Sequence, residues 1–225
     1  MTDLSVSYIF GQAWALTKKN FLWLVGTFVV FYLIVGGVSV FSMLPPGASI
    51  SDIAQPGFHP AQGNGWMGNA VTYLISFIFT MGYYTAALRV SRGTGTMTLD
   101  CFLRPLMLYV KYFAVIILVS LATIAGLCLL IVPGIYVAIR LAFSVIYLLD
   151  HPEAGVMESI KASWHMTADH VLELIGLYIV AIFVGLLGFL CCCVGFFVAY
   201  PVVIMALVQI YLVLNDEYMQ QTASR

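Results

Sequence analysis

The sequence predicts an all-α protein, a six-span transmembrane helix bundle with amphipathic interfacial helices. Hydrophobic residues make up 62% of the 225 residues and charged residues only 8%, which leaves too few polar groups to cover a soluble domain. Inside lipid, every backbone N–H and C=O needs an internal partner, so long apolar runs must form helices or barrel strands. The runs in this chain are continuous and lack the alternation of barrel strands, which indicates helices.

Six apolar runs define the expected spans. Each approaches or exceeds the roughly 20 residues that a helix needs to cross a hydrocarbon core of about 30 Å. We expect one integral membrane domain over residues 1–225, with an external loop rich in proline and glycine over residues 44–68. The predicted spans cover residues 21–43, 69–88, 112–132, 135–149, 171–190 and 196–214.

An amphipathic helix is predicted over residues 1–19, before the first span. Val6, Phe10, Ala13 and Trp14 lie near one face of that helix when it is drawn with 3.6 residues per turn. Such a helix either lies in the headgroup plane or caps the cytoplasmic end of the bundle.

A second amphipathic helix is predicted over residues 152–168. Pro152 suits the first helical position, because its missing N–H would have no partner there. Met157, Ile160 and Trp164 share one face by their spacing. The same two alternatives, a headgroup-plane helix or a cap on the bundle, apply to this segment.

The basic residues predict the orientation. Cytoplasmic loops of membrane proteins carry an excess of Lys and Arg. Eight of the nine basic residues flank spans on one side, and the connections at 44–68, 133–134 and 191–195 contain none. We therefore expect both termini in the cytoplasm. The eight residues are Lys18, Lys19, Arg89, Arg92, Arg104, Lys111, Lys161 and Arg225.

Residues 13–30 and 163–180 share a pattern that predicts an internal repeat. The offset is 150 residues throughout, and six of the 18 positions are identical. Both copies would run outward from the cytoplasm, so the two units would be parallel and related by an axis along the membrane normal. The identical pairs are Trp14–Trp164, Thr17–Thr167, Leu22–Leu172, Leu24–Leu174, Gly26–Gly176 and Val30–Val180.

The stretch of residues 131–174 carries a recognisable motif: a Pro-Gly pair, an arginine seven residues after the proline, and a Ser-Trp-x-Met-Thr segment. This stretch resembles the membrane-domain family of glycerophosphoryl diester phosphodiesterases and its bacterial relatives. The resemblance implies a six-span bundle in the bacterial cytoplasmic membrane. No soluble phosphodiesterase domain is present in this sequence, so the family name implies no such activity here. The motif residues are Pro133, Gly134, Arg140, Ser163, Trp164, Met166 and Thr167, with Met166 in place of the more usual leucine.

Arg140 is the main candidate for a functional side chain. A charge at mid-membrane costs about 2.5–3.5 kcal/mol on insertion scales, and such residues usually face the bundle interior. One interpretation is a contact with an anion or a lipid headgroup. The other is structural, with Arg140 donating to backbone carbonyls near Pro133 or pairing with Glu173.

The sequence predicts no metal site and leaves two alternatives for its cysteines. His165, His170 and Glu173 do not share one helical face, so we predict no metal site and no cofactor. Cys128 and the consecutive residues 191–193 lie at similar external depth, so a disulfide between them is geometrically feasible. The alternative is that these cysteines are small packing residues.

The sequence contains no catalytic motif, which predicts a protein that is not an enzyme. Its net charge of −1 argues against a nucleic-acid partner. We expect a helper or scaffold that organises membrane proteins or lipid, with anionic lipids, other membrane proteins or a second copy as partners. The alternative is a transporter or lipid flippase with a site near Arg140.

Overall fold

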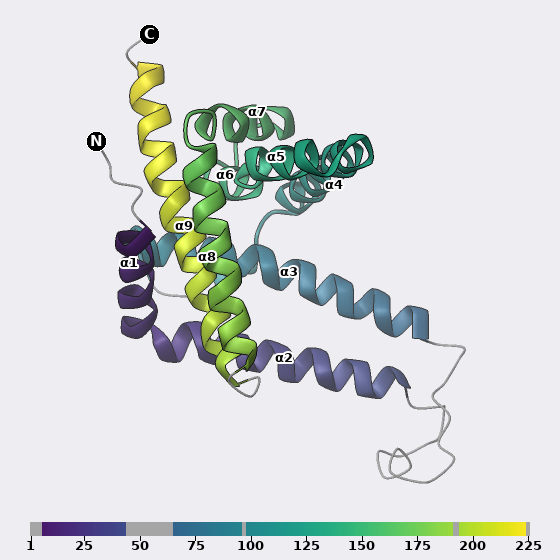
Figure 1. Ribbon diagram of the computed structural model, residues 1–225. Helices are drawn as coiled ribbons and strands as arrows, with labels where there is room; N and C mark the ends of the chain where they lie inside the picture. The colour runs from purple at the N-terminus through teal and green to yellow at the C-terminus, as the bar shows by residue number, and fades with distance from the viewer. Residues whose placement is uncertain (1–5, 44–64, 96–97, 191–193, 224–225) are drawn as a thin grey trace.

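The computed structural model describes residues 6–43, 65–95, 98–190 and 194–223, and within these ranges the chain is helical without strands. Six helical segments are long and apolar enough to cross a membrane, which confirms the predicted all-α bundle (Figure 1). The helices are α1 (Val6–Lys19), α2 (Phe21–Met43), α3 (Gly65–Ser91), the short 3-10 helix η2 (Leu99–Cys101), α4 (Leu106–Leu129), α5 (Ile131–Leu141), α6 (Ser144–Asp150), α7 (Val156–Met166), α8 (Val171–Leu190) and α9 (Val194–Ala223).

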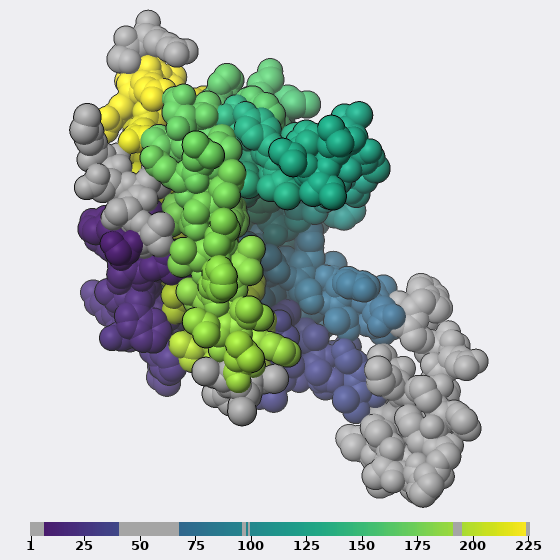
Figure 2. Space-filling model, viewed as in Figure 1, coloured from purple at the N-terminus to yellow at the C-terminus, as the bar shows by residue number. Residues whose placement is uncertain are grey.

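The long helices pack as three antiparallel hairpins, α2–α3, α4–α5 and α8–α9. Their tips lie apart, and α6 and α7 lie near the other ends of the hairpins (Figure 1). The space-filling view shows the α4–α5 and α2–α3 hairpins extending apart from each other, with α8 in front of α2 (Figure 2). The hairpins therefore meet mainly at the end of the molecule that carries most of its charged residues.

The second helix of each hairpin faces the centre of the bundle. In the most apolar stretch of the first helices, α2, α4 and α8, only 11–17% of residues are buried. The corresponding share is 39–56% for α3, for α5 with α6, and for α9. The core is therefore built from α3, α6 and α9, with Tyr83, Leu148 and Tyr211 among its buried side chains.

A short element precedes each hairpin and packs on the last part of another hairpin. α1 packs mainly on α9, η2 packs on α3, and α7 packs mainly on α6. This cyclic arrangement joins the three hairpins at their charged ends.

Several helices are longer than their apolar runs. α8 has the predicted bounds, whereas α4 begins six residues before the expected start at 112 and ends three residues before the expected end at 132. α3 extends beyond 69–88 at both ends, and α9 continues past 214 to Ala223. Hydropathy marks only the part of a helix that lies in lipid, while the backbone hydrogen bonds continue into the polar region. Residues 44–64, most of the expected external loop, lie outside the described residues.

The connection between α4 and α5 differs from the expected turn at Pro133–Gly134. Only Leu130 is extended, and α5 already begins at Ile131. Pro133 therefore sits in the first turn of α5, where a missing N–H is tolerated. The expected span of residues 135–149 is also divided, because α5 ends at Leu141 and α6 begins at Ser144.

The second amphipathic helix starts later than predicted. α7 begins at Val156, and the Gly155 N–H donates to Glu158 Oε2 at 3.1 Å. Of the face predicted from Met157, Ile160 and Trp164, Met157 and Trp164 are exposed and Ile160 is partly buried, whereas three small residues and Met166 are buried. Small side chains allow close approach to α5 and α6, a requirement that an apolar pattern does not reveal. The buried residues of α7 are Ser159, Ala162, Ser163 and Met166.

The first amphipathic helix is rotated in a similar way. α1 buries Ile9, Ala13 and Thr17, whereas Trp14 is exposed and Phe10 is only partly buried. Of the face predicted from Val6, Phe10, Ala13 and Trp14, Ala13 is buried and Trp14 is exposed, so the buried face is rotated towards Ile9 and Thr17. The reason is again that α1 approaches α9 closely through its small residues.

Candidate functional site

The Arg140 side chain is buried against two aromatic rings. Its guanidinium carbon lies 4.4 Å from the ring centroid of Trp164 and 5.6 Å from that of Tyr136. Only 6% of Arg140 is exposed. A cation over an aromatic face is attracted by the ring quadrupole, more strongly when both are desolvated. Trp164 belongs to α7, outside the spans, so the charge is held where α5 meets this short helix.

The backbone of Arg140 is contacted by two hydroxyl groups of the α7 segment. Ser163 Oγ donates to the Arg140 carbonyl at 2.8 Å, and Thr167 Oγ1 lies 3.3 Å from the same carbonyl while it donates to the Ser163 carbonyl at 2.8 Å. The last carbonyls of a helix lack partners within the helix, and α5 ends one residue after Arg140. The break before α6 thus explains why hydroxyl residues are needed at these positions of α7.

Four of the seven motif residues therefore meet. Arg140, Ser163, Trp164 and Thr167 form one cluster, and Met166 is buried on the same helix as Ser163 and Trp164. Pro133 and Gly134 lie at the other end of α5, about 10 Å away along the helix. Gly134 is closely packed there, because a Cβ atom built on it would lie 2.7 Å from Leu127 Cα.

Glu173 is bound elsewhere and is not the partner of Arg140. His170 Nδ1 lies 3.0 Å from Glu173 Oε2, and His170 Nε2 lies 2.9 Å from Glu217 Oε2. One imidazole thus links the start of α8 to the charged end of α9. His165, in contrast, is exposed on α7.

Among the described residues, no three His, Cys, Asp or Glu side chains form a group that could hold a metal ion. Cys128 is exposed and has a free thiol. Residues 191–193 lie outside the described ranges, so a disulfide to them stays a prediction.

Equivalent positions of the two matched segments have similar environments. Thr17 Oγ1 donates to the Ala13 carbonyl at 2.8 Å, and Thr167 Oγ1 donates to the Ser163 carbonyl at the same distance. Leu24, like its counterpart Leu174, is fully buried. These similarities agree with an offset of 150 residues, and the duplication itself stays a prediction.

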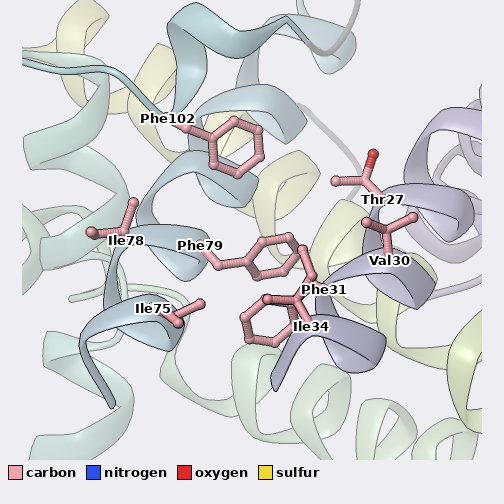
Figure 3. Close-up of a pocket in the computed structure, with 8 residues that line it drawn as sticks. All are labelled: Thr27, Val30, Phe31, Ile34, Ile75, Ile78, Phe79 and Phe102. Carbon is pink, nitrogen blue, oxygen red and sulfur yellow. The ribbon is translucent and has the colours of Figure 1, made fainter. Parts of the chain in front are cut away.

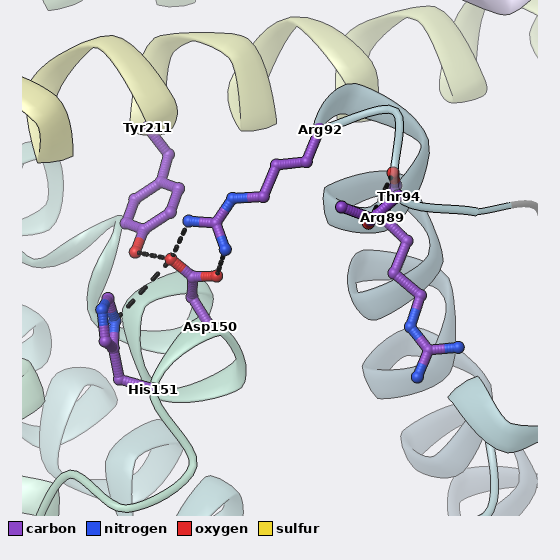
Figure 4. A network of polar contacts seen from close by, with 6 residues as sticks. All are labelled: Arg89, Arg92, Thr94, Asp150, His151 and Tyr211. Atoms are coloured by element: carbon purple, nitrogen blue, oxygen red, sulfur yellow. Dashed lines mark hydrogen bonds and ion pairs between the residues drawn. The ribbon is translucent and has the colours of Figure 1, made fainter.

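A second polar cluster, centred on Asp150, was missed by sequence reasoning. Arg92 pairs with both carboxylate oxygens, at 2.5 and 2.6 Å, and the Tyr211 hydroxyl donates to Oδ2 at 2.7 Å (Figure 4). The Asp150 side chain is 4% exposed. It therefore joins α3, α6 and α9 through one carboxylate. The only sequence signal was an acidic residue at the end of an apolar run.

Lys111 extends this polar region. Its Nζ donates to the carbonyls of Pro152 and Ala154 at 3.0 Å each and to that of Glu153 at 3.4 Å. Lys111 thus holds the segment between α6 and α7 against α4. The sequence had marked it only as a charge that sets the orientation.

An open apolar groove lies between α2 and α3. Its volume is about 290 Å³, and Phe31 stacks on Phe79 with ring centroids 3.8 Å apart (Figure 3). Both walls belong to candidate membrane spans. The lining consists of Thr27, Val30, Phe31, Ile34, Ile75, Ile78, Phe79 and Phe102.

Because Trp164 covers Arg140, we expect replacement of Trp164 to cost more stability than replacement of Trp14. Trp164→Leu is expected to lower the free energy of unfolding by about 2 kcal/mol, because it uncovers a buried cation. Trp14→Leu is the matched control, since Trp14 is similarly exposed but contacts the exposed Lys18 at 5.0 Å. Its expected cost is about 0.5–1 kcal/mol. Unfolding in detergent measures both, and equal losses would contradict the assigned role of Trp164.

The fold and its sites define a multi-pass α-helical membrane protein. No family model, curated protein or solved structure matches this chain. The resemblance to the phosphodiesterase membrane-domain family therefore stays a prediction.

Proposed function

We propose that this protein is a non-enzymatic membrane scaffold that organises lipid and, through it, other membrane proteins. The groove between α2 and α3 carries the proposal. It is open, almost wholly apolar, and bounded by two helices that are apolar enough to span a membrane. In a bilayer, the molecules that reach such a groove from the side are lipid acyl chains.

A second groove supports the same function. It lies between α3 and α4, has a volume of about 470 Å³, and is lined by aromatic residues that include Tyr73, Phe77 and Phe113. The α2–α3 groove lies within one hairpin, and the α3–α4 groove lies between two hairpins. A fold of this kind presents lipid with several apolar recesses rather than one convex surface.

The proposed location is the bacterial cytoplasmic membrane, with both termini in the cytoplasm. The distribution of Lys and Arg supports this orientation. The Asp150 cluster and the Lys111 contacts gather at the same end of the bundle, which would then face the cytoplasm.

The transport alternative receives less support from the geometry. A transporter site at Arg140 requires a side chain that a substrate can reach. The guanidinium is instead packed on Trp164 and Tyr136, and only 6% of Arg140 is exposed.

The proposal is tested by counting retained lipid. The protein is purified in a mild non-ionic detergent, and bound phospholipid is measured by native mass spectrometry. Ile34→Trp fills the α2–α3 groove and is expected to lose most of that lipid. Ile182→Trp is the matched control, because Ile182 is an exposed isoleucine on α8 outside the groove lining.

Two results would contradict the proposal. One is a wild-type protein that retains no phospholipid, and the other is an equal loss in both tryptophan variants. Reconstituted vesicles provide a third measurement. Accelerated exchange of a labelled phospholipid between the two leaflets, absent from protein-free vesicles, would favour the flippase alternative.

A further inference from the structure

A pocket of mixed polar and apolar lining lies at the charged end of the bundle. Its volume is about 220 Å³, well above the roughly 30 Å³ that one water molecule occupies in the liquid. It is bounded by the last turns of α3, the segment before α4 and the end of α6. The lining residues are Thr85, Leu88, Arg89, Arg92, Thr94, Arg104, Leu149, Asp150 and Pro152.

The charges of this pocket are unbalanced. Three arginines and one carboxylate line it, which leaves a net charge of +2. Asp150 takes the guanidinium of Arg92, whereas the guanidinium of Arg89 points away from that carboxylate (Figure 4). Among the described residues, Arg89 Nη1 donates to a neutral oxygen, Thr98 Oγ1, at 3.2 Å. One carboxylate therefore serves one of the three arginines.

Arg104 is the least satisfied of the three arginines. Its Nε is buried and has no hydrogen-bond partner among the described residues. Within the same ranges, Arg104 forms no ion pair, and no aromatic ring covers it as Trp164 covers Arg140. A buried donor without a partner costs about 1–3 kcal/mol, more for a charged group, so Arg104 Nε requires an acceptor, which a water molecule or a bound anion would supply.

We propose that the pocket lined by Arg89, Arg92 and Arg104 binds a phosphate group, either as a free anion or as the headgroup of an anionic phospholipid. Guanidinium groups match phosphate oxygens in geometry and charge, and they bind them through paired hydrogen bonds. The pocket lies next to the ends of spans α3 and α6, where a headgroup would reach it from the membrane surface. This site goes beyond the lipid scaffold proposed above and does not depend on the α2–α3 groove.

The test uses the full chain in a non-ionic detergent, with thermal stability as the readout. Three probes are titrated separately: inorganic phosphate, micelles with phosphatidylglycerol, and micelles with phosphatidylcholine. The wild-type melting temperature is expected to rise in a saturable way with phosphatidylglycerol and much less with phosphatidylcholine. A similar rise with inorganic phosphate would identify a free phosphate as a sufficient ligand, whereas no rise would identify the headgroup.

Three variants locate the effect. Arg104→Gln is expected to raise the half-saturating concentration about tenfold or more, the loss of one charge-assisted hydrogen bond. Arg104→Lys keeps the charge but loses the planar guanidinium that can donate two parallel hydrogen bonds, so an intermediate half-saturating concentration is expected. Lys161→Gln removes one charge from α7, outside the pocket, and should leave the titration unchanged. Without ligand, Arg104→Gln should melt no lower than wild type, because Arg104 makes no described polar contact.

Two outcomes would overturn the phosphate site. One is the absence of a saturable rise with both anionic probes. The other is an equal shift in Arg104→Gln and Lys161→Gln, which would indicate a diffuse charge effect. Ile34→Trp should retain the response, so that failure of the groove proposal and failure of the phosphate site remain distinguishable.

Discussion

Gly134→Ala is expected to destabilise the protein by about 1–3 kcal/mol, the usual cost of overpacking a well-packed contact. The added Cβ would lie 2.5 Å from Leu127 Cδ2 and 2.7 Å from Leu127 Cα. A side-chain atom can move aside, but the α-carbon moves only with its helix. The hairpin of α4 and α5 would have to open, and the shift would act on Arg140 at the other end of α5.

The same contact can be tested from its other side. Gly126→Ala would place a Cβ 2.9 Å from Gly134 Cα, so a similar loss is expected. Gly176→Ala is the control, because no atom lies within 4 Å of the added Cβ and alanine is the better helix former by about 1 kcal/mol. Denaturation in detergent measures all three variants. A loss for Gly176→Ala as large as that for Gly134→Ala would contradict a specific close approach.

Arg92→Ala is expected to cost about 2–4 kcal/mol of unfolding free energy. It leaves the Asp150 carboxylate, 4% exposed, with the Tyr211 hydroxyl as its nearest donor. Breaking a buried ion pair from one side costs about 3–5 kcal/mol. The value is reduced here because the Arg92 side chain is 41% exposed and partly solvated in the native state.

A double-mutant cycle separates the pair from its surroundings. Asp150→Asn keeps an acceptor for Tyr211 and removes the charge, so we expect a smaller loss than for Arg92→Ala. The combined variant should be more stable than the sum of the two losses predicts, since no charge is then buried without a partner. Strict additivity of the two changes would show that Arg92 and Asp150 are not coupled.

The polar contacts were only partly predictable from the sequence. Arg140 stood out because a charge inside an apolar run is rare. Ser163, Trp164 and Thr167 stood out because they belong to the same sequence motif as Arg140. The partners could not be inferred, because Glu173, the acidic partner that the sequence suggested, pairs with His170. Arg104 gave no signal of its own, since it is one of the basic residues that the topology alone accounted for, and Asp150 was marked only as an acidic residue at the end of an apolar run.

The sequence by itself determined the class of this protein and the number of its spans. Continuous apolar runs must form helices in lipid, and this requirement holds wherever the helices later pack. Only the tertiary structure decided which faces are buried, because small residues such as Ala13 and Ser163 allow close approach without a strong hydrophobic pattern. It also decided the partners of each charge, because those partners come from helices far apart in the chain, as in the contact between Arg92 and Asp150.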